Sequence, residues 1–382
     1  MLRPVASPRI LINALSLTQG GGGRSYLVNV LRELERDPRG FDFTVAVDAR
    51  DQLASAELRG IELALVRLPA LGHSARLPLR VVYEQLALPF RAARFDLIYC
   101  PADLAPALAT TPIVVQLQNL HIYDHRFYDT VRIRVLEQLV RLGVRRARRI
   151  LFATNAAADR IRQRIPIPAQ RIAIVPHGVA PESFDTDRSP GVAGAKPYLF
   201  LAASLERHKR IEVLIRSLQH VEDPALEAWI AGTDELDPPY AAELRRLTAE
   251  LDLTSRVRFL GSVPYRQILS YYRGALAFAF PSLLETFGHP TLEAMFAGTP
   301  IIAADIPATR ELAGDVALYF PPDDAIALAR AADRVVRERE AANERVARGR
   351  ARAAEFSWKR CADGLCGAFD EALREHRAGV MG

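Results

Sequence analysis

Short apolar runs recur along the whole chain and alternate with longer stretches in which apolar residues return at helical spacing. This alternation is typical of parallel α/β architecture, because strand, helix and strand form one crossover unit. In the first half, strands are expected at residues 9–13, 43–47, 97–100, 113–117, 150–153 and 172–175. In the second half they are expected at residues 198–203, 226–231, 257–261, 276–280 and 301–304.

The two series of predicted strands are separated by a segment without periodicity. Residues 181–197 are rich in Pro, Gly, Asp and Ser, which favours a linker. A chain of 382 residues is also too long for one ordinary core. We therefore predict an N-terminal Rossmann-like domain over residues 1–180 and a second one over 198–361. The stretch 325–355, rich in Arg and Glu, is predicted to be helical with a solvated charged face.

Composition narrows the class of protein. The chain is 49% apolar and 25% charged, as globular proteins in water are. Its apolar runs are shorter than the roughly 20 residues that span a bilayer, and the run 10–17 is interpreted as a strand rather than a signal peptide. The three cysteines, Cys100, Cys361 and Cys366, form no CxxC pair, which indicates a reducing cytoplasm and no structural zinc.

The charge balance also limits the possible partners. A formal net charge of +5 is mild, and aromatic residues are not interleaved with basic ones, so nucleic acid is disfavoured. Ligands that carry phosphate, or an anionic membrane face, are the expected partners.

The most informative segment, residues 276–302, is predicted to form strand, loop, helix and strand. Pro290 suits the first turn of the helix and Gly298 its end. Glu285 then lies in the loop at the carboxyl end of a strand and Glu293 in the first helical turns, so both border the crevice where open α/β sheets bind ligands. The amides around 287–292 would suit a phosphate. Taken singly, Glu285 is equally well explained as a solvated loop acid and Glu293 as a complement to the helix dipole.

As a whole, this segment resembles the retaining, nucleotide-sugar-dependent glycosyltransferases of family four, also called glycosyl transferases group one. The hallmark of that family is the frame P-S-x-x-E-x-F-G-x-P-x-x-E-A-M-x-x-G-x-P. Matches to the frame are Pro281, Ser282, Glu285, Phe287, Gly288, Pro290, Glu293, Ala294, Met295, Gly298 and Pro300. Residues 310–318 and 321–323 also resemble the family. The resemblance implies the GT-B fold, with two facing Rossmann-like domains, an interdomain cleft and a C-terminal helix within 362–382 that crosses back onto the first domain.

A transferred sugar leaves a nucleoside diphosphate behind, so its growing negative charge must be stabilised by a metal or by fixed cations and amides. The sequence has no convincing Asp-x-Asp metal pair, and we expect no metal and no cofactor, the nucleotide sugar being a substrate. Arg207 and Lys209 follow a predicted strand and are the candidate cations. The chain has only three lysines among its 50 lysines and arginines, and the family places a lysine at the position of Lys209. Arg207 matches less cleanly, and an ordinary surface charge is the alternative for both.

Candidate residues also follow the strands of the first domain. The four glycines of 20–23 allow a close approach of backbone to ligand, and the family commonly carries G-G-x-G-R there, near donor phosphates and acceptor. After the strand at 113–117 the family often has a histidine, a position that matches Gln118 here, with His121 three residues further on. Gln118 is suited to bonding a hydroxyl, whereas His121 faces either the acceptor or the core.

The stretch 130–149 carries seven arginines among apolar residues. A solvated basic face on a core-packed helix explains it, and contact with anionic lipid is the alternative.

Together, the residues and the resemblance predict a retaining, metal-independent glycosyltransferase, with transfer of a hexosyl group to a glycan, lipid-linked or small-molecule hydroxyl. It is expected in the cytoplasm, with possible peripheral contact at the inner face of the membrane. By the resemblance, Glu293 would bind the ribose, Arg207 and Lys209 the diphosphate, and Glu285 the sugar. The candidate donor-binding residues are Gly22, Gly23, Phe287, Gly288, His289, Thr291, Leu292 and Glu293. A sugar-nucleotide epimerase of the same fold and a non-catalytic nucleotide-sugar-binding subunit are the alternatives.

Overall fold

The computed structural model describes residues 7–17, 22–49, 61–68, 73–179 and 196–381. The chain divides into two compact units: unit 1 is Met1–Gly178 with Trp358–Gly382, and unit 2 is Val179–Ser357. Most of the predicted linker lies outside the described residues. The eleven strands predicted from the sequence are all present, each within one residue of its expected bounds.

Unit 1 contains a seven-stranded parallel sheet in the order β3-β2-β1-β4-β5-β6-β7. Its strands are β1 (Arg9–Asn13), β2 (Asp42–Asp48), β3 (Glu62–Val66), β4 (Leu97–Cys100), β5 (Ile113–Gln116), β6 (Arg149–Phe152) and β7 (Ile172–Ile174). Strand β3 was not predicted. It lies at the edge of the sheet and most of its side chains are partly or fully exposed, so it lacks the continuous apolar run of the inner strands.

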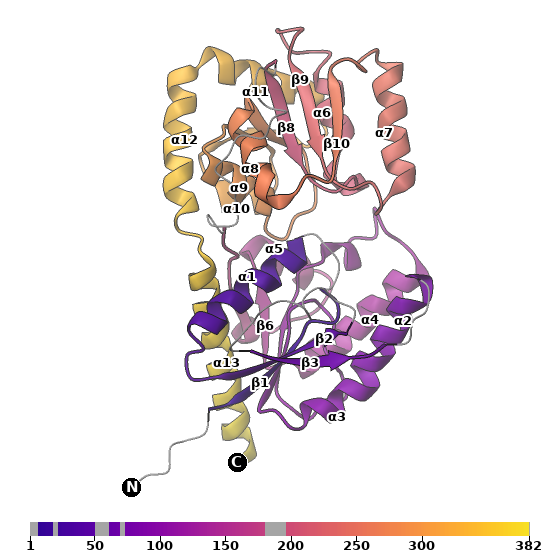
Figure 1. Cartoon of the computed structure of the whole chain (residues 1–382), viewed down its shortest axis with the longest axis vertical. Coiled ribbons are helices and arrows are strands. Elements are labelled where there is room, and N and C mark those ends of the chain that lie inside the picture. Colours follow the sequence, from indigo (N-terminus) through magenta and orange to yellow (C-terminus); the bar gives the residue numbers. More distant parts are fainter. Residues whose placement is uncertain (1–6, 18–21, 50–60, 69–72, 180–195, 382) are drawn as a thin grey trace. The chain divides into compact units, whose positions relative to one another are not determined.

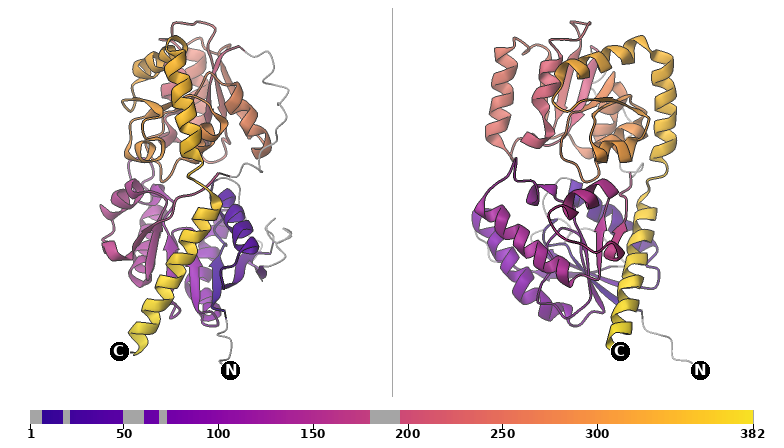
Figure 2. Two further views of the ribbon diagram at one scale, coloured as in Figure 1. Left: turned by 90° about the vertical axis from the view of Figure 1, so that its left-hand side faces the viewer. Right: turned by 180° about the vertical axis from the view of Figure 1, so that it is seen from behind.

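The helices of unit 1 cover both faces of this sheet (Figure 1). They are α1 (Gly22–Arg36), α2 (His73–Val82), η2 (Tyr83–Ala87), α3 (Leu88–Ala92), η3 (Leu120–Ile122), α4 (Val131–Arg146), α5 (Asn155–Arg162), η4 (Ala169–Arg171) and α13 (Trp358–Met381). Right-handed crossovers place α2, α3 and α4 on one face and α1 on the other. Helix α13 packs against α1 and belongs to unit 1 although it ends the chain (Figure 2). Among the described helices, α13 included, none is long and apolar enough to cross a membrane.

Unit 2 contains a six-stranded parallel sheet in the order β10-β9-β8-β11-β12-β13. Its strands are β8 (Tyr198–Ala202), β9 (Glu227–Ala231), β10 (Val257–Gly261), β11 (Ala277–Phe280), β12 (Ile301–Ala304) and β13 (Ala317–Phe320), the last not predicted. Its helices are η6 (Arg207–Lys209), α6 (Ile211–Ser217), α7 (Pro238–Glu250), α8 (Tyr265–Gly274), α9 (His289–Ala297), α10 (Pro307–Ala313), α11 (Ala325–Arg337) and α12 (Arg339–Ala353). The stretch predicted to be helical at 325–355 is thus two helices, which separate at Glu338.

Strand order reverses once in each sheet, and these two points locate the candidate sites. The reversal lies between β1 and β4 in unit 1 and between β8 and β11 in unit 2. In open α/β sheets, ligands bind at the carboxyl ends of the strands that flank such a switch point, because the crossovers diverge there and leave a crevice. The buried side chains of β8 and β11, including Leu199, Leu201 and Ala279, join the core cluster that fixes the two strands side by side.

Candidate active site

The loop and helix after β11 have the geometry that the sequence predicts. Gly288 caps α9 with φ of 89°, Pro290 lies in its first turn, and Gly298 ends it with φ of 78°. Both glycines occupy the left-handed region that side chains with a Cβ rarely adopt. A Cβ on Gly298 would also come within 2.1 Å of the Arg350 guanidinium. Glu285 consequently lies in the loop and Glu293 in the helix, as expected.

Lys209 and Glu285 meet at the switch point of unit 2. The Lys209 Nζ donates a hydrogen bond of 2.7 Å to Glu285 Oε1, across 76 residues of sequence. Their side chains are only 15% and 9% exposed. The loops that carry them are joined by the Leu283 amide, which donates to the His208 carbonyl at 2.9 Å. The pairing of β8 with β11 therefore brings together a cation and a carboxylate that the sequence singled out separately.

Glu293 sits among tyrosines of α8. The Tyr272 hydroxyl donates to Glu293 Oε2 at 2.9 Å, and the Tyr265 hydroxyl also bonds this carboxyl. Burial raises the pKa of Glu293 to about 7, although both tyrosine hydrogen bonds act to lower it. Neither tyrosine was predicted as a site residue, because aromatic residues at helical spacing are ordinarily part of the core.

Arg207 is held by acids of α7 and its flanking loop. Its guanidinium forms hydrogen bonds of 2.8 and 2.7 Å to the two carboxylate oxygens of Glu243 and lies 3.5 Å from Asp237. It also stacks over the Tyr240 ring at 5.4 Å. The predicted diphosphate role of Arg207 remains a prediction, and in this structure its guanidinium is bound by Glu243.

The side chains of the other candidates around α9 are largely buried. Phe287, Thr291 and Leu292 have buried side chains. The Phe287 ring packs on His289 with 5.1 Å between centroids, and burial lowers the pKa of His289 to about 4, which keeps that imidazole neutral near pH 7. Thr291 Oγ1 is buried without a hydrogen-bond partner among the described residues.

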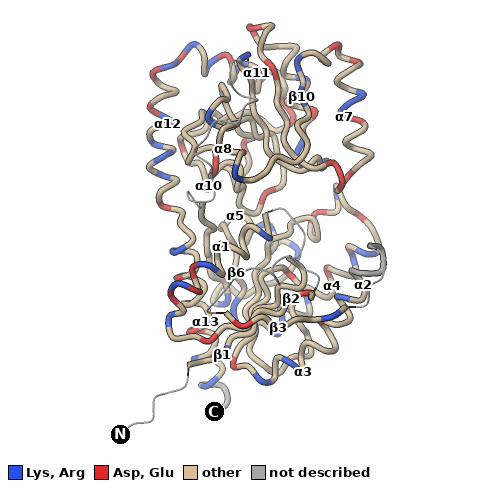
Figure 3. Tube along the Cα trace, in the orientation of Figure 1, with Lys and Arg blue, Asp and Glu red and all other residues tan. Residues whose placement is uncertain are grey.

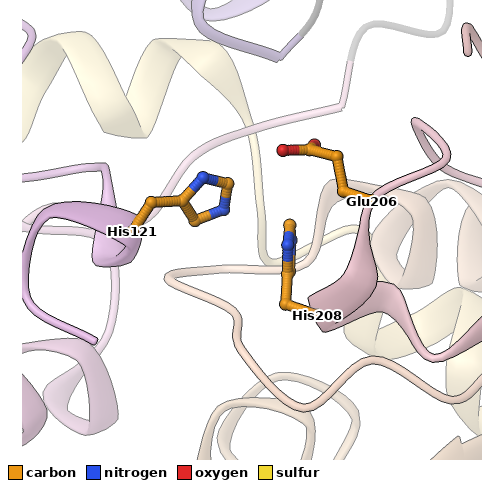
Figure 4. A group of neighbouring side chains, drawn as sticks. All are labelled: His121, Glu206 and His208. Carbon is orange, nitrogen blue, oxygen red and sulfur yellow. The ribbon is translucent and has the colours of Figure 1, made fainter. Parts of the chain in front are cut away.

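Between β8 and α6, Glu206 and His208 (Figure 4) are the sequence neighbours of the candidate Arg207. Both side chains are largely buried. The Ser204 hydroxyl donates to Glu206 Oε2. The Ser282 hydroxyl approaches the His208 carbonyl at 3.5 Å, so the backbone of this turn is held on the loop after β11.

In unit 1, Gly22 and Gly23 form the first turn of α1, so the helix begins before the expected apolar stripe; residues 18–21 of the glycine loop lie outside the described residues. A Cβ on Gly23 would come within 2.8 Å of the end of the Leu17 side chain, which would have to shift. The prediction that Gly22 and Gly23 contact the donor remains a prediction.

Gln118 and His121 lie at the carboxyl end of β5. The Gln118 side-chain amide donates to the Pro101 carbonyl at 2.7 Å. His121 belongs to η3 (Figure 4), and its ring stacks on Tyr128 with 4.7 Å between centroids.

Asp103, after β4, is a site residue that the sequence analysis missed. It is buried, has φ of 48°, and accepts hydrogen bonds from the Tyr123 hydroxyl at 3.1 Å and the Asn119 amide at 3.3 Å. Burial raises the pKa of Asp103 to about 7. This aspartate therefore fixes the loop that carries Gln118 and His121. Its position just after a strand beside the switch point was the available signal.

Two family models match consecutive parts of the chain. Residues 20–183 match Glycosyltransferase Family 4, and residues 183–352 match Glycosyl transferases group 1. Among curated proteins, the chain is 28% identical over 220 residues to the O-antigen chain mannosyltransferase RfbU of Salmonella typhimurium, covering 57% of this chain and 59% of that one. It is 33% identical over 202 residues to the D-inositol 3-phosphate glycosyltransferase of Nocardia farcinica, covering 50% and 44%. The matched regions thus span about half the length of these relatives.

Solved structures show the same fold over nearly the full chain. An Anabaena protein, HepE, in complex with UDP and glucose has a TM-score of 0.75 at 21% identity, over 95% of this chain and 99% of that one. A sucrose-phosphate synthase from Thermosynechococcus elongatus has a TM-score of 0.76 at 19% identity, over 96% and 100%. These likenesses place the two parallel-sheet units in the GT-B class of fold. With both family models matched in sequence order, the chain belongs to the group 1 glycosyltransferases.

Proposed function

We propose that the protein transfers a sugar from a nucleoside-diphosphate sugar to a hydroxyl group of an acceptor. The observation that carries this proposal is the hydrogen bond between Lys209 and Glu285 at the switch point of unit 2. The N-terminus of α9, the helix that contains Glu293, follows shortly after Glu285 in the chain. A diphosphate, a sugar and a ribose need a cation, hydroxyl-binding carboxylates and a helix N-terminus within one crevice. The family membership and the UDP bound by the Anabaena protein support the same donor class.

Within this proposal, each side chain has a distinct task. The Lys209 ammonium stabilises charge that grows on the leaving diphosphate. Glu285 holds Lys209 in place and offers its other carboxylate oxygen to the sugar hydroxyls. Glu293, when ionised, accepts hydrogen bonds from the ribose hydroxyls. The α9 N-terminus, opened by Gly288, adds the positive end of a helix dipole near the phosphates.

We further propose that the transfer retains the anomeric configuration and needs no metal ion. The support for a metal-independent reaction is the low exposure of Lys209, since a fixed ammonium in a partly dry site replaces the charge that a divalent ion would supply. The retaining outcome rests on the family resemblance. In such a reaction the leaving phosphate itself assists in taking the proton from the acceptor hydroxyl, and the acceptor is a glycan, a lipid-linked glycan or a small molecule.

The experiment that tests the proposal is a donor screen with purified protein. UDP-, GDP-, ADP- and TDP-sugars are incubated with and without glycan acceptors, and release of the nucleoside diphosphate is measured. We expect release from one donor class, accelerated by an acceptor. Interconversion of the donor sugar without nucleoside diphosphate release would identify an epimerase, and binding without either reaction would identify a non-catalytic subunit; both results would overturn the proposal.

A further inference from the structure

Exposed apolar side chains gather on one face of unit 1. Of the twelve large apolar side chains that are exposed among the described residues, seven lie on α2, η2, α3, α4 and the loop between β4 and β5. They are Val82, Leu86, Phe90, Leu108, Val131, Val135 and Leu142, and we name this set the α2–α4 surface. Phe90 is 82% exposed and Val131 80%, so neither is a core residue with one visible edge. Large apolar side chains gathered in this way ordinarily mark an interaction site.

The two helical parts of the α2–α4 surface are joined into one face. Val82, Leu86 and Phe90 follow one another at intervals of four residues and line the solvent side of the continuous helical segment 73–92. The Gln85 side-chain amide donates to the Ala105 carbonyl at 3.2 Å, and the Ala107 backbone amide donates to Gln85 Oε1 at 3.0 Å. Gly143 of α4 packs against the backbone of Ala105 from the other side. Leu108 is therefore held between the two helices.

Most of the charged residues around these apolar side chains are arginines; Asp129, just before α4, is exposed and pairs with Arg134 at 2.8 Å. The segment 73–94 contains four arginines and one acid, Glu84, and α4 contains five arginines and one acid, Glu137. Both glutamates are buried. Glu137 bonds Arg141 at 2.6 Å, and Glu84 lies 3.6 Å from Arg80. Blue positions consequently dominate α3 and α4 in the charge-coloured trace (Figure 3).

We propose that the α2–α4 surface docks on an anionic lipid membrane, with the apolar side chains entering the boundary between headgroups and acyl chains and the arginines contacting lipid phosphates. The sequence predicted lipid contact for the stretch that forms α4 alone. The structure adds the helical segment 73–92, which exposes the apolar side chains of Val82, Leu86 and Phe90. A lipid surface fits both properties, because a face whose charged residues are mostly arginines attracts anionic headgroups, whereas two copies of it would repel each other. This inference does not depend on the proposed sugar transfer.

The test is co-sedimentation of the full chain with vesicles. Wild-type protein is expected to bind vesicles of phosphatidylglycerol and phosphatidylcholine but not of phosphatidylcholine alone, and to be released by salt. A Leu86→Ser/Phe90→Ser variant should bind at least about tenfold more weakly, because it removes apolar area that enters the membrane. The matched control is Ile326→Ser/Val336→Ser on α11 of unit 2, whose apolar residues are also exposed. It should bind like the wild type.

Thermal melts show whether each variant is folded. The Leu86→Ser/Phe90→Ser variant should have the melting temperature of the wild type, because the changed side chains are exposed. A second variant, Val131→Ser/Val135→Ser, tests the other half of the surface and should also lose binding. The proposal would be overturned if the wild-type protein does not bind anionic vesicles, or if the variants bind them as tightly as the wild type. Concentration-dependent dimers that disappear in the same variants, without vesicle binding, would assign the surface to self-association instead. Because vesicle binding is measured without any nucleotide sugar, its failure leaves the donor screen unaffected.

Discussion

The Lys209→Met variant separates the structural and chemical roles of the Lys209–Glu285 pair. Methionine keeps the apolar stem of the side chain beside the Phe280 ring, which Lys209 Nζ approaches to 5.7 Å, and removes only the charge. A hydrogen bond to a charged group contributes about 1.5–3 kcal/mol, and breaking a fully buried ion pair costs about 3–5 kcal/mol. Because both side chains keep slight exposure, we expect a loss of about 2–3 kcal/mol in the free energy of unfolding.

For a unit of this size, that loss lowers the melting temperature by roughly 4–12 °C. The matched control is Lys359→Met, because Lys359 is 67% exposed and lies 3.3 Å from Asp363. Such an exposed pair contributes at most about 1 kcal/mol, so the control should melt close to the wild type.

Turnover distinguishes the two roles. If the Lys209 ammonium stabilises the leaving diphosphate, kcat on the identified donor should fall roughly 100- to 1,000-fold, with a smaller change in KM. In the double variant Lys209→Met/Glu285→Gln, no uncompensated carboxylate remains, so stability should return towards the wild type while turnover stays low. A stable double variant that also regains turnover, or a Lys209→Met enzyme at wild-type kcat, would refute the assignment of this lysine to the diphosphate.

Four further predictions follow from the same site. Turnover should survive EDTA; loss with EDTA that magnesium or manganese reverses would contradict the metal-independent proposal. Arg207→Ala should change kcat less than about tenfold, because its guanidinium is held by Glu243; a loss as large as that of Lys209→Met would show that it turns to the phosphates when donor binds. Nucleotide affinity should rise with pH through about 7, since Glu293 has its pKa raised to about 7 and its ionised carboxylate accepts hydrogen bonds more strongly than the protonated acid, and Glu293→Gln should abolish this rise. The raised pKa has the opposite effect on stability: the folded state holds the proton more tightly than the unfolded state, so wild-type stability relative to Glu293→Gln should fall as pH rises from about 4.5 to about 7 in thermal melts.

The strands that are buried on both faces could be predicted from the sequence. Inner strands such as β4 and β12 are short continuous apolar runs, and their bounds follow directly from that pattern. Edge strand β3 was missed because most of its side chains are partly or fully exposed. Strand β13 was missed although it is a short, mostly buried apolar run like the strands that were predicted. The break at Glu338 was missed for another reason: its backbone leaves the helical region without a Pro or Gly to announce it.

The positions of candidate site residues could be predicted only where a sequence motif specifies the local backbone geometry. Gly288, Pro290 and Gly298 specify the ends of α9, and the positions of Glu285 and Glu293 follow from them. The side chains that bond these residues from distant parts of the sequence could not be predicted. The contacts of Arg207 with Glu243 and of Glu293 with Tyr272 depend on the packing of helices distant in sequence.

The most direct test of the donor site is calorimetric titration of nucleoside diphosphates into the wild type, Glu293→Gln and a control, Glu340→Gln, whose side chain is exposed on α12. The account predicts that one of UDP, GDP, ADP or TDP binds the wild type and the control alike. It predicts that Glu293→Gln binds that nucleotide more weakly by about 1–3 kcal/mol, the cost of losing a hydrogen bond to a charged group. Equal affinity of Glu293→Gln and wild type, or no binding of any of the four nucleotides to the wild type, would contradict it.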